Sequence, residues 1–304
     1  MMNNSGETYH VPVLLREAVD GLNIKSDGIY VDVTFGGGGH SREILSRLGT
    51  KGRLYAFDQD EEAYGNKIDD ARFTLIEGNF ANLKNYLRLE GVRQVDGVLA
   101  DLGISSHQIN KPERGFSTRF DEKLDMRMDK TSRLTAFEVV NKYDEYELRK
   151  IFSQYGDLKN AATLAKSIVK AREEQPVETT GELIDIVSKH FPKLKKNKFL
   201  AKLFQAIRIE VNGEIEALKK MLSQTAEIIK PGGRLSVISY HSLEDRLVKR
   251  FIRDGIFEGQ PEKDFYGNVS VPFKKVGKLI VPSMEEIEKN KRARSAKLRI
   301  GEKL

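Results

Sequence analysis

The run of four glycines at Gly36–Gly39 constrains this 304-residue chain more than any other feature. It follows the apolar, β-branched segment Ile29–Val33, typical of a buried strand, and precedes Ser41–Leu48, which has the apolar spacing of a helix. Glycines let the backbone turn with positive φ and approach a ligand closely. Amides at the start of the following helix favour a polar or anionic group. The sequence therefore predicts a ligand-binding strand–loop–helix unit.

Strand-like segments alternate with helical ones through the first part of the chain. After Ile29–Val33 come Leu54–Phe57, Phe73–Ile76 and Val95–Ala100, and each runs into a polar loop. Strands that alternate with helices pair in parallel through right-handed crossovers. The predicted fold class is therefore α/β with a doubly wound sheet, and ligands are expected at the carboxyl ends of its strands.

A long helical stretch interrupts the alternation after Asp101. Its helical patterns cover residues 145–153, 161–171, 180–189 and 199–210. The sheet pattern then resumes with a helix at Glu214–Ile229, a stop and turn at Lys230–Gly233 and a strand at Arg234–Ser239. We expect a sheet domain of residues 1–104 and 213–304 and an inserted, mostly helical domain of residues 105–212.

The C-terminal part is basic. The chain carries a formal charge of +6, and residues 274–304 contain ten Lys or Arg against four Asp or Glu. Leu279–Val281 and Lys297–Ile300 are expected to form an antiparallel pair at the sheet edge. The basic residues of this part predict contact with nucleic-acid phosphates, with a solvated charged surface as the alternative; they are Lys291, Arg292, Arg294, Lys297 and Arg299.

The composition excludes several classes of protein. The chain has 0 Cys, which excludes disulfides, thiolate nucleophiles and cysteine-ligated metal sites. Its first residues lack the apolar segment of a signal peptide, and no apolar run approaches the roughly 20 residues of a membrane span. We therefore expect a cytoplasmic protein with no membrane partner.

The glycine run does not match the common nucleotide motifs. A phosphate-binding P-loop would continue with Lys and Ser or Thr, but His40 and Ser41 follow the glycines. Ser41 also stands where the third glycine of the dinucleotide motif would lie. The pattern Asp-x-x-x-Gly-x-Gly, with Asp32, Gly36 and Gly38, is that of S-adenosylmethionine-dependent methyltransferases. A tight turn without function is the alternative.

Polar and aromatic residues follow the next strands at the same expected edge. Asp58 ends the second strand at the distance where an acid meets the ribose hydroxyls of an adenosine cofactor, and Asp60 is expected to cap the next helix. Phe80 could stack on adenine or pack in the core. Asp101 ends the fourth strand, where the transferred group would meet its acceptor; loop capping is the alternative.

Further motifs extend over nearly the whole chain. They are His10–Leu15, Thr34–His40, Asp101–Ser106, Glu113–Ser117, Leu124–Asp129, Phe204–Ile209, Ser239–Arg246 and Ala293–Arg299. In these motifs and their order the sequence resembles the bacterial small-subunit ribosomal RNA cytosine-N4 methyltransferases. The resemblance implies a Rossmann-like class I methyltransferase sheet with an inserted helical substrate-recognition domain. It also implies S-adenosylmethionine as cofactor. Because the sulfonium methyl of this cofactor is already a strong electrophile, we expect no metal.

The resemblance further implies methyl transfer to the exocyclic N4 amine of a cytidine in the decoding region of 16S ribosomal RNA, within the small ribosomal subunit. The cofactor contacts that it implies are Gly38, Gly39, His40, Asp58, Phe80, Asp101 and Gln108. Asp101 is the candidate catalytic residue, either accepting a hydrogen bond from the cytosine amine or touching the cofactor. A homodimer is left open.

Two clusters are candidates for RNA contact, with salt-bridged loops or caps as the alternative. The first interleaves charge with aromatics and consists of Arg114, Phe116, Arg119 and Phe120. The second follows the fifth strand and consists of His241, Glu244, Asp245 and Arg246. Leu124–Met128, with alternate methionines, is interpreted as packing.

Two other functions are compatible with parts of this pattern. A ribosome-assembly or RNA-binding protein could keep the cofactor pocket only to stabilise its fold. A nicotinamide reductase is disfavoured, because the dinucleotide motif is incomplete.

Overall fold

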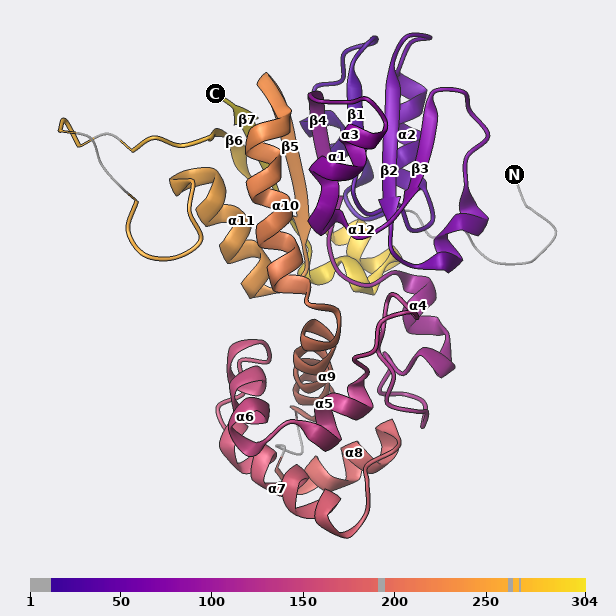
Figure 1. Cartoon of the computed structure of the whole chain (residues 1–304), viewed down its shortest axis with the longest axis vertical. Coiled ribbons are helices and arrows are strands. Elements are labelled where there is room, and N and C mark those ends of the chain that lie inside the picture. The colour runs from indigo at the N-terminus through magenta and orange to yellow at the C-terminus, as the bar shows by residue number, and fades with distance from the viewer. Residues whose placement is uncertain (1–11, 191–194, 262–264, 268) are drawn as a thin grey trace. The chain divides into compact units, whose positions relative to one another are not determined.

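The computed structural model describes residues 12–190, 195–261, 265–267 and 269–304 (Figure 1). His10 and Val11 of the first motif lie outside these residues. The chain divides into two compact units, one of Met1–Gly103 with Glu216–Leu304 and the other of Ile104–Ile215. We call them the sheet unit and the helical unit.

The described residues of the sheet unit form a seven-stranded sheet with the order β3-β2-β1-β4-β5-β7-β6. The strands are β1 (Ile29–Asp32), β2 (Arg53–Asp58), β3 (Phe73–Glu77), β4 (Val95–Asp101), β5 (Ile229–Ser239), β6 (Phe273–Ile280) and β7 (Lys297–Lys303). Strands β1 to β5 pair in parallel, whereas β7 pairs antiparallel with both β5 and β6. The predicted doubly wound sheet and its antiparallel edge pair are confirmed.

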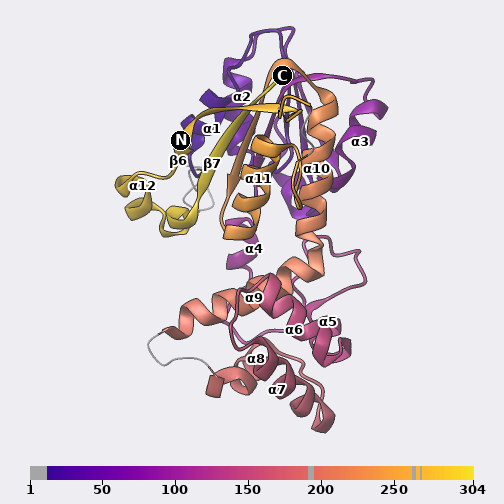
Figure 2. The same cartoon turned by 90° about the vertical axis from the view of Figure 1, so that its left-hand side faces the viewer.

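Helices cover both faces of this sheet (Figure 2). The α-helices are α1 (Leu15–Gly21), α2 (Gly39–Arg47), α3 (Leu83–Leu89), α10 (Glu214–Ile228), α11 (Ser242–Asp254) and α12 (Met284–Lys289). The shorter 3-10 helices are η1 (Glu61–Asn66), η2 (Phe80–Asn82) and η6 (Lys291–Ser295). Residues of α1 and α2 share a buried core with β1, β2 and β7. On the opposite face the Gln224 side chain of α10 accepts a hydrogen bond from Lys84 N of α3 at 2.8 Å.

The expected turn at Lys230–Gly233 is wrong, because these residues lie inside β5. Val95 pairs with Ile229 and Gly97 with Arg234, so the four residues form a bulge opposite Asp96. Gly232 adopts a φ of 78°, and Lys230 Nζ donates to Asp96 Oδ2 at 2.9 Å. The residues typical of a turn are present, but Ile229 before them and Arg234 after them both pair with β4, so the segment remains part of the strand.

The helical unit is built around its own apolar core. Its helices are α4 (Ser106–Asn110), η3 (Pro112–Arg114), α5 (Ala136–Lys142), α6 (Glu145–Gln154), α7 (Ala161–Glu174), α8 (Thr180–Val187), η4 (Ser188–His190) and α9 (Lys196–Asn212). Capping boxes start four of them, at Ser105, Thr135, Asp144 and Thr179. These side chains accept bonds from amides that the helix cannot satisfy, which fixes where each helix begins.

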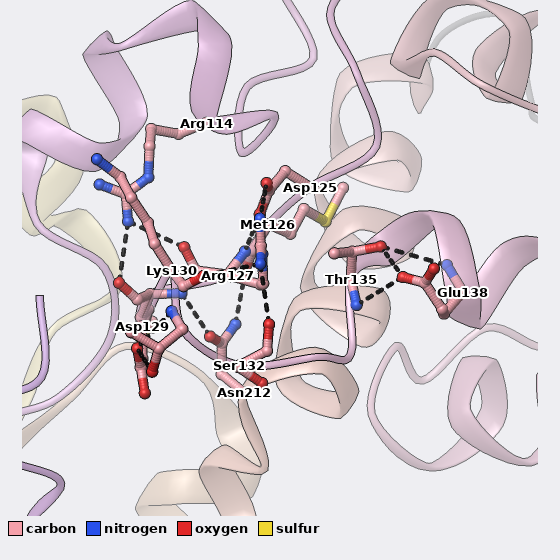
Figure 3. Close-up of polar contacts among 12 residues, drawn as sticks. Arg114, Asp125, Met126, Arg127, Asp129, Lys130, Ser132, Thr135, Glu138 and Asn212 are labelled. Atoms are coloured by element: carbon pink, nitrogen blue, oxygen red, sulfur yellow. Dashed lines mark hydrogen bonds and ion pairs between the residues drawn. The ribbon is translucent and has the colours of Figure 1, made fainter.

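A polar network fastens the long loop before α5 to the end of α9 (Figure 3). Asn212 donates to Met126 O at 2.8 Å and accepts from Met128 N at 2.7 Å. Asp125 forms a paired ion contact with Arg127, at 2.9 and 2.8 Å. Met126 is fully buried and Met128 is 7% exposed. The interpretation of Leu124–Met128 as packing is confirmed.

Candidate active site at the carboxyl ends of the sheet strands

The glycine loop connects β1 to α2 and leaves part of its backbone uncovered. Gly36 and Gly38 have φ values of 50° and 75°, where other residues are strained. A Cβ at Gly38 would also lie 2.9 Å from the Phe35 ring, whereas Cβ atoms at Gly36 or Gly37 would meet no heavy atom within 4 Å. The space beside Gly36 and Gly37 is therefore open, and a ligand can approach the main chain there because these glycines have no side chain.

Asp32 holds this loop in place from inside. Its carboxylate is fully buried and accepts hydrogen bonds from Ser41 Oγ at 2.7 Å and Thr34 N at 3.1 Å. Burial raises the pKa of Asp32, against the lowering effect of His40 and these hydrogen bonds. The first residue of the Asp-x-x-x-Gly-x-Gly pattern thus joins the end of β1 to the start of α2.

Asp58 lies beside the open part of the loop. Its Oδ2 accepts from Gly36 N at 2.8 Å, and its Oδ1 accepts from Asp60 N at 2.9 Å. Burial raises the pKa of Asp58 to about 6, which those two hydrogen bonds partly oppose. Each carboxylate oxygen can accept a further hydrogen bond. The expectation for Asp60 is confirmed, because Asp60 caps η1 by accepting from Glu62 N.

Phe80 begins η2, directly after β3 and its following loop. The ring is half-buried, and the preceding Asn79 caps η2 through Ala81 N. The Asn79 amide also donates to the Gln59 side chain at 2.7 Å, which joins the loops after β2 and β3. Gly36, Asp58 and Phe80 therefore follow three neighbouring strands, in the arrangement that the sequence predicts.

Asp101, at the end of β4, is held by residues from two other elements. Tyr240, directly after β5, donates its hydroxyl to Asp101 Oδ1 at 2.8 Å. Asp101 N donates to Thr34 Oγ1 at 2.7 Å. The other carboxylate oxygen, Oδ2, lies 3.7 Å from His40 Nδ1. The carboxylate is thus fixed from both sides of β4.

The protonation of this group is set mainly by burial. Burial raises the pKa of Asp101 to about 6, although His40 and the Tyr240 hydrogen bond favour the ionised form. Burial and the Asp101 carboxylate together raise the pKa of Tyr240 well above its usual value. Tyr240 therefore stays a hydrogen-bond donor, and Asp101 changes charge close to neutral pH.

His40 and Tyr240 are two further residues of the site, of which only His40 was predicted from the sequence. His40 is 4% exposed, and its Nε2 has no hydrogen-bond partner among the described residues. Tyr240 was not singled out from the sequence, although it belongs to the Ser239–Arg246 motif. The signal was its position: β5 lies next to β4, so the first residue after β5 comes to the same edge as Asp101.

Gln108 belongs to the helical unit. It is buried and forms a capping box at the start of α4, accepting from Ser105 N at 3.0 Å through Oε1. The structure thus gives Gln108 a capping role within its own unit, and its cofactor contact stays a prediction.

Two of the four residues of the first candidate RNA cluster are buried inside the helical unit. Arg114 is 3% exposed and donates to the carbonyls of Arg127 and Met128 at 2.9 and 3.1 Å (Figure 3). Phe116 is also buried in the helical core. Arg119 and Phe120 are exposed. The expected RNA contact is wrong for Arg114 and Phe116, because interleaved charge and aromatics do not reveal burial.

The second cluster and part of the basic segment are also engaged inside the protein. His241 and Glu244 form the capping box of α11. Asp245 accepts from Arg299 Nε at 2.7 Å and Lys297 Nζ at 3.2 Å. Lys297 and Arg299 therefore connect β7 to α11, and their expected contact with phosphates stays a prediction. Arg246 remains exposed.

Among the residues described, the structure contains no helix both long and apolar enough to cross a membrane.

The sheet order and the residues at its carboxyl edge define a class of enzyme. A parallel sheet with an antiparallel edge, a glycine loop after β1 and acids after β2 and β4 make the Rossmann-like fold of the class I methyltransferases, which depend on S-adenosylmethionine. The chain belongs to the MraW methylase family, whose model matches residues 7–304.

Relatives are similar over almost their full length. The chain is 65% identical to the ribosomal RNA small subunit methyltransferase H of Christiangramia forsetii over 296 residues, 97% of this chain and 98% of the relative. It is 64% identical to the protein of the same name from Flavobacterium johnsoniae, with the same coverage. The identity to that of Bacteroides thetaiotaomicron is 58%, over 97% of this chain and 98% of the relative.

Proposed function

We propose that this protein methylates 16S ribosomal RNA, transferring a methyl group from S-adenosylmethionine to the exocyclic N4 amine of a cytidine in the decoding region. The observation that carries the proposal is the full-length identity, up to 65%, with proteins named ribosomal RNA small subunit methyltransferase H. The sequence resemblance adds the cytosine N4 amine. Cysteine nucleophiles, which would open a route to ring-carbon methylation, are excluded because the chain has 0 Cys.

The residues at the sheet edge fit the cofactor. The open backbone at Gly36 and Gly37 leaves room for it, Asp58 has acceptor capacity for ribose hydroxyls, and His40 Nε2 is buried without a partner among the described residues. Gly38, Gly39 and Phe80 complete the proposed contacts. When bound, S-adenosylmethionine supplies an electrophilic sulfonium methyl group.

Asp101 is the proposed catalytic residue. In this proposal its carboxylate accepts a hydrogen bond from the cytosine amine, orients the nitrogen lone pair and takes the proton that the amine loses. Its pKa of about 6 leaves it ionised at neutral pH yet basic enough for this role. Tyr240 and Thr34 are positioning residues, since they hold Asp101 through its side chain and its amide.

The helical unit, Ile104–Ile215, is the proposed substrate-recognition domain, as the family resemblance implies. The target base must be unpaired or extruded, because a paired cytosine hides its amine in the duplex. Lys291, Arg292 and Arg294 of η6 remain proposed phosphate contacts. A ribosomal substrate implies a cytoplasmic location and the small ribosomal subunit as partner.

The test is radiolabelled methyl transfer to naked 16S ribosomal RNA, isolated small subunits and intact ribosomes, followed by nucleoside analysis. The expected product is N4-methylcytidine in at least one of the three substrates. Label in adenosine, in C5 of cytosine, or in protein would contradict the cytosine-N4 proposal. RNA binding without any transfer would instead indicate an RNA-binding or assembly protein.

A further inference from the structure

We propose that a hollow on the helical unit binds one nucleotide of a single-stranded RNA segment. This inference rests on the proposed function and names a second site of RNA contact. The hollow has a volume of about 410 Å³, within the range of about 300–1,000 Å³ typical of small-ligand pockets. Its lining residues are Thr118, Arg119, Ile184, Lys196, Asn197 and Leu200.

The hollow combines an apolar floor with a polar, basic rim. Leu200 is 3% exposed, and Ile184 packs against the helical core. Arg119, Lys196 and Asn197 are exposed. A nucleotide has the same division, with a flat base that prefers apolar contact and a phosphate that attracts cations. We therefore place the base on the floor and the phosphate at the rim.

Hydrogen bonds fix the wall that carries Arg119. Arg119 N donates to Ser117 Oγ at 3.2 Å, and Thr180 at the start of α8 donates its hydroxyl to Phe120 O at 2.8 Å. Gly181 N donates to Asp121 Oδ1, also at 2.8 Å. Thr118 and Arg119 are thus held against α8 before any ligand binds, which lowers the entropic cost of binding.

The charge of the lining favours an anion, because it contains Arg119 and Lys196 and no carboxylate. The Arg119 guanidinium has no acceptor among the described residues, and the neighbouring Asp121, which accepts from Gly181 N, does not line the hollow. On the opposite wall, α9 begins with Lys196 and Asn197, and Lys195 precedes them. Arg119 can grip a phosphate through two parallel N–H bonds, and the Asn197 amide can read a base edge.

Phe120 adds a position for a second base. Its side chain is 43% exposed, which is unusual for a large apolar group, and it directly follows Arg119. Stacking on an exposed ring is how proteins hold unpaired bases without reading their sequence. An unpaired strand would therefore use the hollow for one nucleotide and Phe120 for a neighbour.

The test measures binding of a ten-nucleotide unstructured oligoribonucleotide by fluorescence anisotropy over a range of salt concentrations. We compare the wild type with Arg119→Gln, Asn197→Ala and Arg119→Gln/Lys196→Gln. Arg149→Gln is the matched control, because Arg149 is an exposed arginine of α6 outside the hollow. All changed side chains are exposed, and equal thermal unfolding midpoints verify that each variant is folded.

We expect the double variant to raise Kd by about tenfold or more and to reduce the salt slope by roughly one. Asn197→Ala should raise Kd for the single strand without changing the salt slope, and Arg149→Gln should match the wild type. KM for the RNA substrate should rise while kcat and cofactor affinity stay constant. Unchanged Kd in all variants would overturn the proposal, as would an equal loss for an RNA duplex of the same length.

The two proposals fail in different ways. If the wild type transfers no methyl group to cytosine but the hollow variants still lose oligonucleotide affinity, the proposed function fails and the nucleotide site stands. If methyl transfer occurs and the variants bind like the wild type, the nucleotide site fails alone.

Discussion

Replacing Tyr240 by Phe removes one hydroxyl and tests how Asp101 is prepared for catalysis. The hydroxyl donates to Asp101 Oδ1 at 2.8 Å, and it favours the ionised carboxylate against the burial that raises the pKa of Asp101 to about 6. A hydrogen bond to a charged group contributes about 1.5–3 kcal/mol, and about 1.4 kcal/mol corresponds to one pH unit. Loss of the bond should therefore move the titration of Asp101 upward by about 1–2 pH units.

The assay is kcat/KM for methyl transfer between pH 5 and 9. A base must be deprotonated to act, so the wild-type rate should fall as pH decreases through about 6. In Tyr240→Phe the same decline should begin about 1–2 pH units higher, while the rate at pH 9 changes less. Tyr146→Phe is the matched control, because Tyr146 is 72% exposed on α6.

A profile of Tyr240→Phe that coincides with the wild type would refute this reasoning. It would mean either that Asp101 does not take the amine proton or that Tyr240 does not tune it. Asp101→Asn separates these cases, since a catalytic base cannot be replaced by an amide, whereas a spectator can. Cofactor affinity, measured in parallel, should change little in Tyr240→Phe.

Three further outcomes are expected. Asp58→Ala should weaken S-adenosylmethionine binding by roughly 1.5–3 kcal/mol in calorimetry, and an unchanged affinity would remove Asp58 from the site. Gly37→Ala should keep the wild-type unfolding midpoint, because its Cβ enters open space, but it should weaken cofactor binding, because that space is where the cofactor is proposed to lie. Gly38→Ala should lower the free energy of unfolding by about 1–2 kcal/mol, because its φ is 75°. The pKa of Asp101 is higher in the folded protein than in the unfolded chain, so ionisation of Asp101 destabilises the folded state. The stability that the protonated Asp101 contributes is therefore present below about pH 4 and is lost as pH rises through about 6. Asp101→Asn should therefore gain up to about 3 kcal/mol over the wild type in urea unfolding at pH 8, and no gain at pH 4.

The sheet could be predicted because its signal is local. Segments such as Val95–Ala100 are short, apolar and β-branched, and their alternation with helices leaves few topologies. Lys230–Gly233 could not be placed in the same way. Its turn residues suggest the end of an element, and only the pairing of Ile229 and Arg234 with β4 shows that the strand continues.

The candidate site was predictable where it depends on strand ends. Asp58 and Asp101 follow apolar runs directly, so their edge of the sheet could be inferred before their contacts. The role of Tyr240 depends on the neighbour relation of β4 and β5, across an insertion that hides it in the sequence. Arg114 was wrongly predicted to contact RNA. Its partners are buried main-chain carbonyls, and the pattern of side chains in a sequence gives no sign of such contacts.

The insertion between β4 and β5 also affects how the chain is made. During synthesis, β1 to β4 leave the ribosome first, and about 130 more residues must follow before β5 can pair with β4. At about 5–20 residues per second, this takes roughly 6–25 seconds. Throughout that time the apolar strand Val95–Asp101 is an open edge that can pair with other nascent chains. The helical unit has its own apolar core and can fold in this interval, before the sheet of this protein is complete.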